Sequence, residues 1–285
     1  MTRARWRRSI GVMGTIAALG AVVLVPAQAQ EPTRLPVVSG IEVRGGGPTF
    51  WDMRNDGSAC ETSDRGFTPV SDGAFGPDYA MSDAFDDGLM VSVNGDDIPD
   101  LDGTLAIKGD DVLVRGRKVS GVRITRAERA LSSSPTLRSL ISFDNRSTSK
   151  KQLTVQWDSD LGSDSSEAVR ATSDGDTTYE LTDRWVVSSD DATTPGDPVL
   201  GFILFGKNAR QAPKTIVNDL GSGCFTVEYR FKVPAHSMRH LLFFTQMTGT
   251  NSKGIAKAMA FDSPSKGLFS GLSTKVKNAV LNWNV

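Results

Sequence analysis

The chain has 285 residues, with 32 basic and 33 acidic side chains, 28 glycines and only two cysteines. A balance this close to neutral, with no basic run after the first 30 residues, argues against nucleic acid and anionic membrane surfaces as partners. Frequent glycines and few long apolar runs favour an all-β protein of many short strands joined by tight turns.

The first 29 residues have the pattern of an export signal. Arginines between Arg3 and Arg8 precede an apolar run from Ile10 to Val25, and Ala27-Gln28-Ala29 is a small-residue cleavage site. The run has 16 residues, fewer than the roughly 20 that span a bilayer, so cleavage is favoured over an anchor. We predict a secreted or periplasmic mature protein without a membrane span. Export by the general or the twin-arginine route stays open.

Removal of this leader takes away four arginines and leaves 28 basic and 33 acidic residues, a net charge of −5. Short strands then alternate with turns such as Asn94-Gly95, where positive φ is tolerated. We expect long loops from Trp51 to Asp87. The strands predicted in this half are Ser39 to Arg44, Leu89 to Val93, Thr104 to Lys108, Val112 to Arg115 and Val119 to Thr125.

The second half predicts longer strands. Leu153 to Trp157 alternates apolar and polar residues, which indicates one wet face and a core position for Trp157. Leu241 to Phe244 is apolar throughout, which indicates a central strand covered on both faces. The other predicted strands are Leu137 to Asp144, Ala168 to Thr172, Thr177 to Leu181, Arg184 to Ser188, Leu200 to Phe205, Phe225 to Val233 and Met238 to Met247.

The apolar period becomes helical after Gly249. A first helix is predicted after a cap at Asn251, and Ser273 can cap a last helix that carries Val276, Val280 and Trp283 on one face. The sequence therefore predicts a large antiparallel two-sheet β-sandwich with a short helical C-terminal cap. Its expected divisions are a signal peptide over 1–29, the sandwich domain over 30–262 and the cap over 263–285.

The two cysteines, Cys60 and Cys224, are predicted to form a disulfide, because an exported chain meets an oxidising environment. Closing so long a loop stabilises a protein by about 2–5 kcal/mol. Two free thiols and a catalytic cysteine are the alternatives. Neither residue belongs to a Cys-x-x-Cys pair, so a zinc site is not indicated.

Aspartates gather on two neighbouring turns. Asp160, Asp164, Asp174 and Asp176 offer hard oxygen ligands that a hairpin can bring together, as calcium requires. The spacing is not that of an EF-hand. The competing interpretation is that Asp and Gly simply form good turns, and the same two interpretations apply to the cluster from Asp96 to Asp102.

Three side chains are candidate ligand-binding groups. Trp51 in a loop and Trp185 beside the acidic turn could stack on sugar rings, although a buried anchor is the alternative for each. His240 lies four residues after His236, and residues four apart in a strand share a face, so both rings could meet one metal or one substrate. The alternative is one exposed histidine and one that forms a hydrogen bond at the end of a strand. No nucleophile elbow, dinucleotide-binding or P-loop motif is found, which argues against a serine hydrolase and against nucleotide binding.

Several short motifs follow one another along the second half of the sequence. They are Gly121 to Arg126, Arg138 to Asn145, Leu161 to Asp164, Ser173 to Asp176, Asp183 to Trp185, Asp197-Pro198, Leu268 to Leu272 and Asn282-Trp283. Their order resembles that of a family of secreted bacterial β-sandwich proteins that has no established biochemical role. The resemblance covers about half of the mature chain and implies a sandwich like the supersandwich of sugar-handling enzymes, with no catalytic residue that can be transferred.

These observations favour non-catalytic binding of carbohydrate or another cell-surface component, with a bound calcium ion as one of the two interpretations of the aspartate turns. One alternative is a carbohydrate-active enzyme of the mutarotase or lyase type, in which His240 and a carboxylate would be the acid–base pair. Another is a structural envelope or host-contact protein. Fold alone is weak warrant for any of these functions.

Overall fold

The computed structural model describes the greater part of the chain, and all described residues belong to the unit Leu35–Val285. The predicted leader, Cys60 and Asp164 lie outside the described residues. The described ranges are 40–46, 49–54, 57–58, 65–66, 84, 89–98, 105–114, 116–160, 167–190, 198–219 and 224–285.

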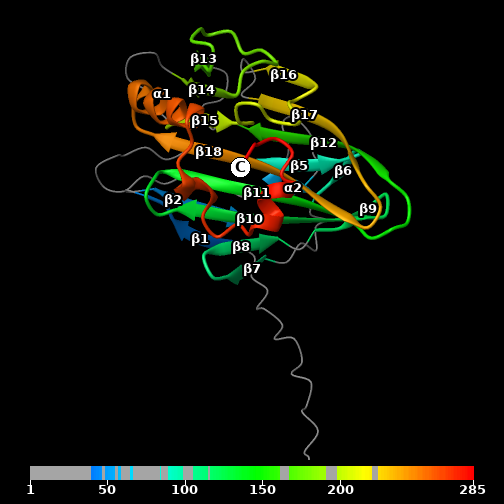
Figure 1. Ribbon diagram of the computed structural model, residues 1–285. Helices are drawn as coiled ribbons and strands as arrows, with labels where there is room; N and C mark the ends of the chain where they lie inside the picture. The colour runs from blue at the N-terminus through cyan, green and yellow to red at the C-terminus, as the bar shows by residue number, and fades with distance from the viewer. Residues whose placement is uncertain are drawn as a thin grey trace, which may run out of the picture. The chain divides into compact units, whose positions relative to one another are not determined.

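The larger sheet of the described residues has nine strands, all antiparallel (Figure 1). Its order is β13-β14-β15-β18-β11-β10-β8-β7, and β9 pairs with β10. The bounds are Leu105–Lys108 (β7), Asp111–Val114 (β8), Lys118–Val119 (β9), Val122–Leu131 (β10), Thr136–Asn145 (β11), Ala168–Thr172 (β13), Trp185–Ser189 (β14), Val199–Ile203 (β15) and Ser237–Thr248 (β18).

The smaller sheet has five described strands in the order β16-β17-β12-β5-β6. They are Met90–Val93 (β5), Asp96–Asp97 (β6), Lys151–Asp160 (β12), Thr215–Asp219 (β16) and Cys224–Val233 (β17). Two short hairpins add Gly40–Arg44 (β1) with Phe50–Arg54 (β2), and Gly57–Ser58 (β3) with Arg65–Gly66 (β4).

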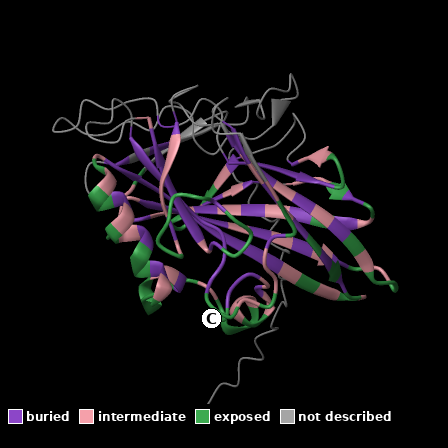
Figure 2. Cartoon of the chain, turned by 90° about the horizontal axis from the view of Figure 1, so that it is seen from above, coloured by how far each residue is buried: buried purple, intermediate pink, exposed green. Residues whose placement is uncertain are grey.

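The two sheets pack through apolar side chains at alternate strand positions. Trp157 of β12 stacks on Phe243 of β18, with ring centroids 4.6 Å apart and an interplanar angle of 6°. Because these rings come from different sheets and are fully buried, they join the sheets into a sandwich. Figure 2 shows buried residues along both sheets and exposed ones at the hairpin ends. The predicted β-sandwich and the core position of Trp157 are confirmed.

The outer face of the larger sheet carries a second core under the C-terminal tail (Figure 1). The tail contains α1 (Asn251–Met259), η3 (Ala260–Asp262), η4 (Lys266–Phe269) and α2 (Thr274–Ala279). Leu242 and Phe244 face this tail, whereas Leu241 and Phe243 face the smaller sheet, and all four are fully buried. The predicted central strand, covered on both faces, is confirmed.

The last residues lock the tail onto β18. The side-chain amide of Asn282 donates to the carbonyls of Leu204 and Leu242, both at 2.7 Å, and its oxygen accepts from the Leu242 N–H at 2.8 Å. The indole N–H of Trp283 also donates to the Leu242 carbonyl, at 2.8 Å. A central strand normally has no free backbone group for such contacts, so β18 binds the tail at the point where its pairing with β15 has ended.

Both helix caps lie near their predicted positions. Ser273 accepts from the Val276 N–H, as predicted, whereas α1 is capped by Thr250, one residue before the predicted Asn251. The first helix thus begins at Asn251, as the helical period predicts, within the range 30–262 that was assigned to the sandwich domain. Within the described residues, no helix is both long and apolar enough to cross a membrane.

Two strand predictions are wrong in detail. The segment Thr177 to Leu181 is a loop, because the Asp183 carboxylate accepts from the Glu180 N–H at 2.8 Å and the Tyr179 ring turns inward onto Phe225. The predicted strand Val119 to Thr125 contains a turn at Ser120 and Gly121, both with positive φ (50° and 87°). This tight turn makes β9 and β10 a hairpin. Strand β16 was not predicted, and the segment from Trp51 to Asp87, expected to form long loops, contains most of β2 and the short strands β3 and β4.

Candidate functional site

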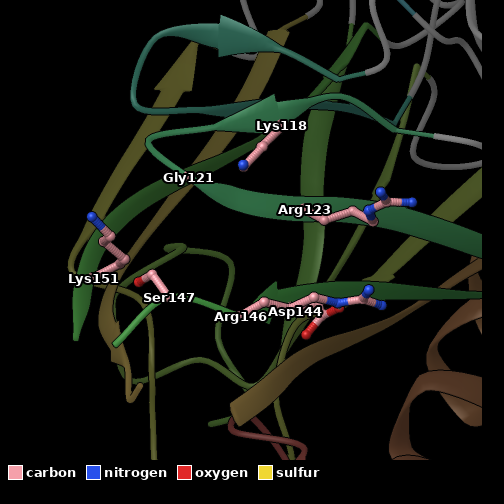
Figure 3. A pocket seen from close by; sticks show the side chains of 7 residues that line it. All are labelled: Lys118, Gly121, Arg123, Asp144, Arg146, Ser147 and Lys151. Atoms are coloured by element: carbon pink, nitrogen blue, oxygen red, sulfur yellow. The ribbon is translucent and has the colours of Figure 1, made fainter. Parts of the chain in front are cut away.

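A basic pocket lies at the hairpin ends of the sandwich, where β9 turns into β10 and β11 turns toward β12 (Figure 3). The cavity has a volume of about 290 Å³. Cationic side chains dominate its lining, which consists of Lys118, Gly121, Arg123, Asp144, Arg146, Ser147 and Lys151.

Strand register places part of this lining in one row across the larger sheet. Lys118 lies opposite Arg123, Arg123 opposite Asp144, and Asp144 opposite Met238. The residues flanking Arg123 in β10 are fully buried in the core, so the row itself is on the outer face, where side chains alternate in direction. Four strands thus bring two cations, one carboxylate and a thioether together on an uncovered surface.

The far wall of the pocket comes from the smaller sheet. Lys151 begins β12, and a Cβ placed on Gly121 would lie 3.7 Å from its Cε atom. Gly121 also has a φ of 87°, a backbone conformation that side-chain-bearing residues rarely adopt. The glycine therefore provides the turn of the β9–β10 hairpin beside the lysine stem.

A buried asparagine holds the remaining wall. The Asn145 amide donates to the carbonyls of Ser149 at 2.8 Å, Val233 at 3.0 Å and Pro234 at 2.9 Å. Its oxygen accepts from the backbone and hydroxyl of Ser147, at 3.1 and 2.7 Å. Asn145 is fully buried and follows Asp144. One side chain therefore fixes the turn that presents Arg146 and Ser147, and joins it to the end of β17.

The charges in the pocket are not balanced. Arg146 Nε lies 2.6 Å from Asp144 Oδ2, and this is the single ion pair of the lining within the described part of the chain. Lys118, Arg123 and Lys151 form no salt bridge with any described residue. Four cations against one carboxylate give a net charge of +3, in a chain whose formal net charge is −1. Such a concentration of one sign attracts anions.

The three predicted ligand-binding side chains lie elsewhere and are buried. Trp51 is fully buried in β2, and Trp185 is 3% exposed with its indole N–H donating to Asp262 at 3.2 Å. His240 is 2% exposed, its Nδ1 lies 2.8 Å from the Ser142 hydroxyl, and its backbone bridges to Val280. These rings present no open face to a sugar, so the anchor alternative describes the two tryptophans.

Burial also changes the acid–base behaviour of His240. Loss of solvent, and to a smaller extent the charge of Arg239, lower the pKa of His240 from 6.5 to about 4. The ring is therefore neutral near pH 7. A neutral, covered imidazole suits a structural hydrogen bond better than proton exchange with a bound substrate.

The two described members of the predicted calcium set lie on an exposed turn after β13. Asp174 Oδ1 accepts from the Thr172 hydroxyl at 2.6 Å, and Asp176 Oδ1 accepts from the Thr178 N–H at 2.7 Å. The Thr172 hydrogen bond lowers the pKa of Asp174. Asp160 ends β12, and its side chain is outside the described part. Among the described residues, no group of three or more potential metal ligands lies together.

Cys224 begins β17 and is buried, at 8% exposure. It is not a free thiol. The predicted partner, Cys60, lies outside the described residues, so the pairing stays a prediction.

Asp158 has an unusual environment on the outer face of the smaller sheet. Burial raises its pKa from 3.8 to about 6, and the charge of Asp97 adds to this, whereas a hydrogen bond with Thr226 opposes it. The group lies between Met90 and Thr226 in the register of the sheet. It does not line the basic pocket.

Comparison with known proteins finds no matching family model and no matching curated protein. Similar solved structures include a mutant of heparan sulfate lyase HepC from Pedobacter heparinus, with 9% identity, a TM-score of 0.42 and coverage of 75% of this chain and 37% of that chain. Another is the GH36 α-galactosidase AgaA from Geobacillus stearothermophilus, with 8% identity, a TM-score of 0.42 and coverage of 77% and 42%. The chain spans less than half the length of either enzyme.

A protein described as an aldose 1-epimerase, from Klebsiella pneumoniae, is 9% identical, with a TM-score of 0.31 and coverage of 56% of this chain and 57% of that chain. The distant structural neighbours are thus carbohydrate-active enzymes and an aldose epimerase.

Proposed function

We propose that the protein is an exported, non-catalytic binding protein for an acidic carbohydrate, held in the basic pocket. The observation that carries this proposal is the composition of the pocket, whose lining contains four cationic side chains and a single carboxylate. Sulfate and carboxylate groups accept charge-assisted hydrogen bonds from lysine and arginine, and arginine can hold them through two parallel bonds.

The carboxylate supports a saccharide over a simple anion. Asp144 accepts hydrogen bonds and cannot donate them when ionised, so it suits a ligand with hydroxyl groups. Acidic sugars carry anionic groups and hydroxyl groups a few ångströms apart. The stems of Lys118 and Lys151 add apolar surface against which a sugar ring can lie.

The pocket supports binding better than turnover. Glycoside hydrolysis uses two carboxyl groups facing each other across a bond, whereas Asp144 is the single carboxylate of the lining. The group with a raised pKa, Asp158, lies outside the pocket.

A glycan array with the mature chain, containing uronate, sulfated and neutral saccharides, tests the proposal, and calorimetry then gives affinities. We expect acidic glycans to bind, with affinity falling as salt is added. Arg123→Ala should weaken binding by about tenfold or more, the usual value of a charge-assisted hydrogen bond.

The matched control is Lys266→Ala, which removes an exposed cation outside the pocket and should leave the affinity unchanged. An array without acidic hits, or an equal loss in the two variants, would refute the proposal.

Calcium at Asp160, Asp164, Asp174 and Asp176 is a separate proposal. One oxygen of Asp174 and one of Asp176 are already engaged with Thr172 and Thr178, so an ion would have to use their second oxygens. Calcium should raise the melting temperature of the wild type, and this rise should be absent in the double variant Asp164→Ala, Asp176→Ala. Equal melting temperatures in calcium and in chelator would remove this proposal.

Export and the disulfide can be tested together. Intact mass spectrometry of the secreted protein should give a chain beginning at Gln30 and lighter by two hydrogens than its reduced form. Peptide mapping should then join Cys60 to Cys224. A full-length product would contradict cleavage of the leader, and a fully reduced product would contradict the disulfide.

A further inference from the structure

We infer that Asp144 determines the selectivity of the basic pocket, favouring acidic saccharides and rejecting small, dense polyanions such as inorganic phosphates. This inference rests on the proposed function and adds a residue that decides which anion is accepted. It is carried by the position of one carboxylate within a cationic lining.

The carboxylate is the last charged member of the row across the larger sheet. In the strand register it is directly between Arg123 on β10 and Met238 on β18, and it pairs with Arg146 from the following turn. In Figure 3 the Arg123 and Arg146 side chains extend in the same direction, and the Asp144 carboxylate lies beside Arg146. The Asp144 side chain is 17% exposed, so a ligand can reach it, whereas Arg146 is 77% exposed.

A fixed negative charge at this point treats two kinds of anion differently. A ligand whose entire surface is anionic places charge against Asp144, and like charges within about 4–6 Å repel each other appreciably. A saccharide can turn a hydroxyl toward the carboxylate and its acidic group toward Arg123 or a lysine, so repulsion is replaced by a hydrogen bond. Oδ2 of this half-buried carboxylate already accepts from Arg146, and Oδ1 is the oxygen that a ligand hydroxyl would meet. An attractive contact with one ligand and a repulsive one with its competitor together give the discrimination.

The alternative role for Asp144 is purely structural, namely to orient Arg146. In that case removal of the Asp144 carboxylate would change the affinity for all anions in the same direction, because every anion would contact the same displaced Arg146 guanidinium. Selectivity, measured as a ratio of two affinities, separates these roles.

The experiment measures, by calorimetry, the affinities of the full mature chain for oligogalacturonate, a heparin oligosaccharide and inorganic tripolyphosphate. The variants are Asp144→Ala and Asp144→Asn. We expect Asp144→Ala to bind tripolyphosphate more tightly and the saccharides more weakly, changing the affinity ratio by about tenfold or more. Asp144→Asn, which keeps a neutral acceptor oxygen, should give an intermediate ratio.

Asp110→Ala is the charge-matched control, since Asp110 is 83% exposed beside Arg129 and does not line the pocket. Its ratio should equal that of the wild type. A ratio unchanged in Asp144→Ala, or changed equally in the control, overturns the selectivity role while leaving the proposed function in place. A wild type that binds neither saccharide overturns the proposed function itself.

Discussion

One strand of the larger sheet has very different surroundings at its two ends. On the outer face of β18, Leu242 and Phe244 lie under the C-terminal tail among aromatic rings. At the other end of the same face, Met238 is 37% exposed beside Asp144. The comparison shows that the tail decides where the core gives way to open surface, because the candidate site begins on the rungs that the helical layer leaves uncovered.

His240 marks the border between the two regions. It lies one rung from Met238 on the outer face, bonded to Ser142 and covered by the segment around Val280. Variants on the two sides of this border should therefore affect different properties. Those under the tail should reduce stability, and those on the open row should reduce binding.

The largest effect is expected for Trp283→Ala under the tail. This ring contacts Phe244, Phe261 and Phe269 and is 1% exposed. Its removal leaves a cavity, which for such a residue costs about 3–5 kcal/mol. Denaturant unfolding measures the loss, and Met238→Ala, at the open end of the same strand, should cost almost nothing. Similar losses for both would contradict the proposed border.

The second effect is a pH dependence from His240. Because its pKa is about 4 in the folded protein and 6.5 ordinarily, protons bind preferentially to the unfolded chain between these values. The histidine's contribution is fully present above pH 6.5 and is lost as the pH falls toward 4, by about 3 kcal/mol in total. Unfolding free energies across this range should show a shallower slope in His240→Asn.

Two controls isolate this slope. His236→Asn changes an exposed histidine at a positive φ that asparagine tolerates, and should leave the slope as it is.

The carboxyl group of Asp158 changes stability with pH in the opposite sense, because its pKa is raised from 3.8 to about 6. The folded protein therefore loses stability from Asp158 as the pH rises from 4 to 6, and Asp158→Asn should remove that loss. An unchanged slope in His240→Asn would show that the ring is solvated.

The smallest effect on stability is expected for Arg123→Ala in the open row. The side chain is exposed and forms no salt bridge with any described residue. Exposed substitutions of this kind change the unfolding free energy by about 0.5 kcal/mol or less. Unfolding curves of this variant should match those of the wild type while its affinity for acidic glycans falls. A large loss of stability would mean that the row is part of the framework.

Much of the buried core and of the helical tail could be predicted from local sequence. Alternation identified Leu153 to Trp157 as a strand with one wet face, and the uniformly apolar run Leu241 to Phe244 identified the doubly covered strand. The Ser273 cap was also predictable, because capping depends on a few adjacent residues. The strand prediction for Thr177 to Leu181 is wrong because the contacts that shape this loop, Asp183 with Glu180 and Tyr179 with Phe225, depend on the tertiary structure.

The open region could not be predicted in the same way. Lys118, Arg123, Asp144 and Lys151 are separated by up to 33 positions and meet only through strand register and the closure of two hairpins. The one local signal was Ser120-Gly121, a turn with a basic residue on each side. Acidic turns were more conspicuous in the sequence. In the structure, the Asp174 and Asp176 carboxylates accept hydrogen bonds from Thr172 and Thr178 of the same segment.

Asn145 gives the pocket a mechanical property. Its amide connects the turn between β11 and β12 to the turn that leads from β17 into β18. One buried side chain thus holds the ends of β11, β12 and β17 together. A molecule held against Arg146 and Lys151 therefore braces both layers at once, and the free energy of its binding opposes their separation. Amide hydrogens in β11, β12 and β17 should exchange more slowly together when the pocket is filled, as a single unit of the protein.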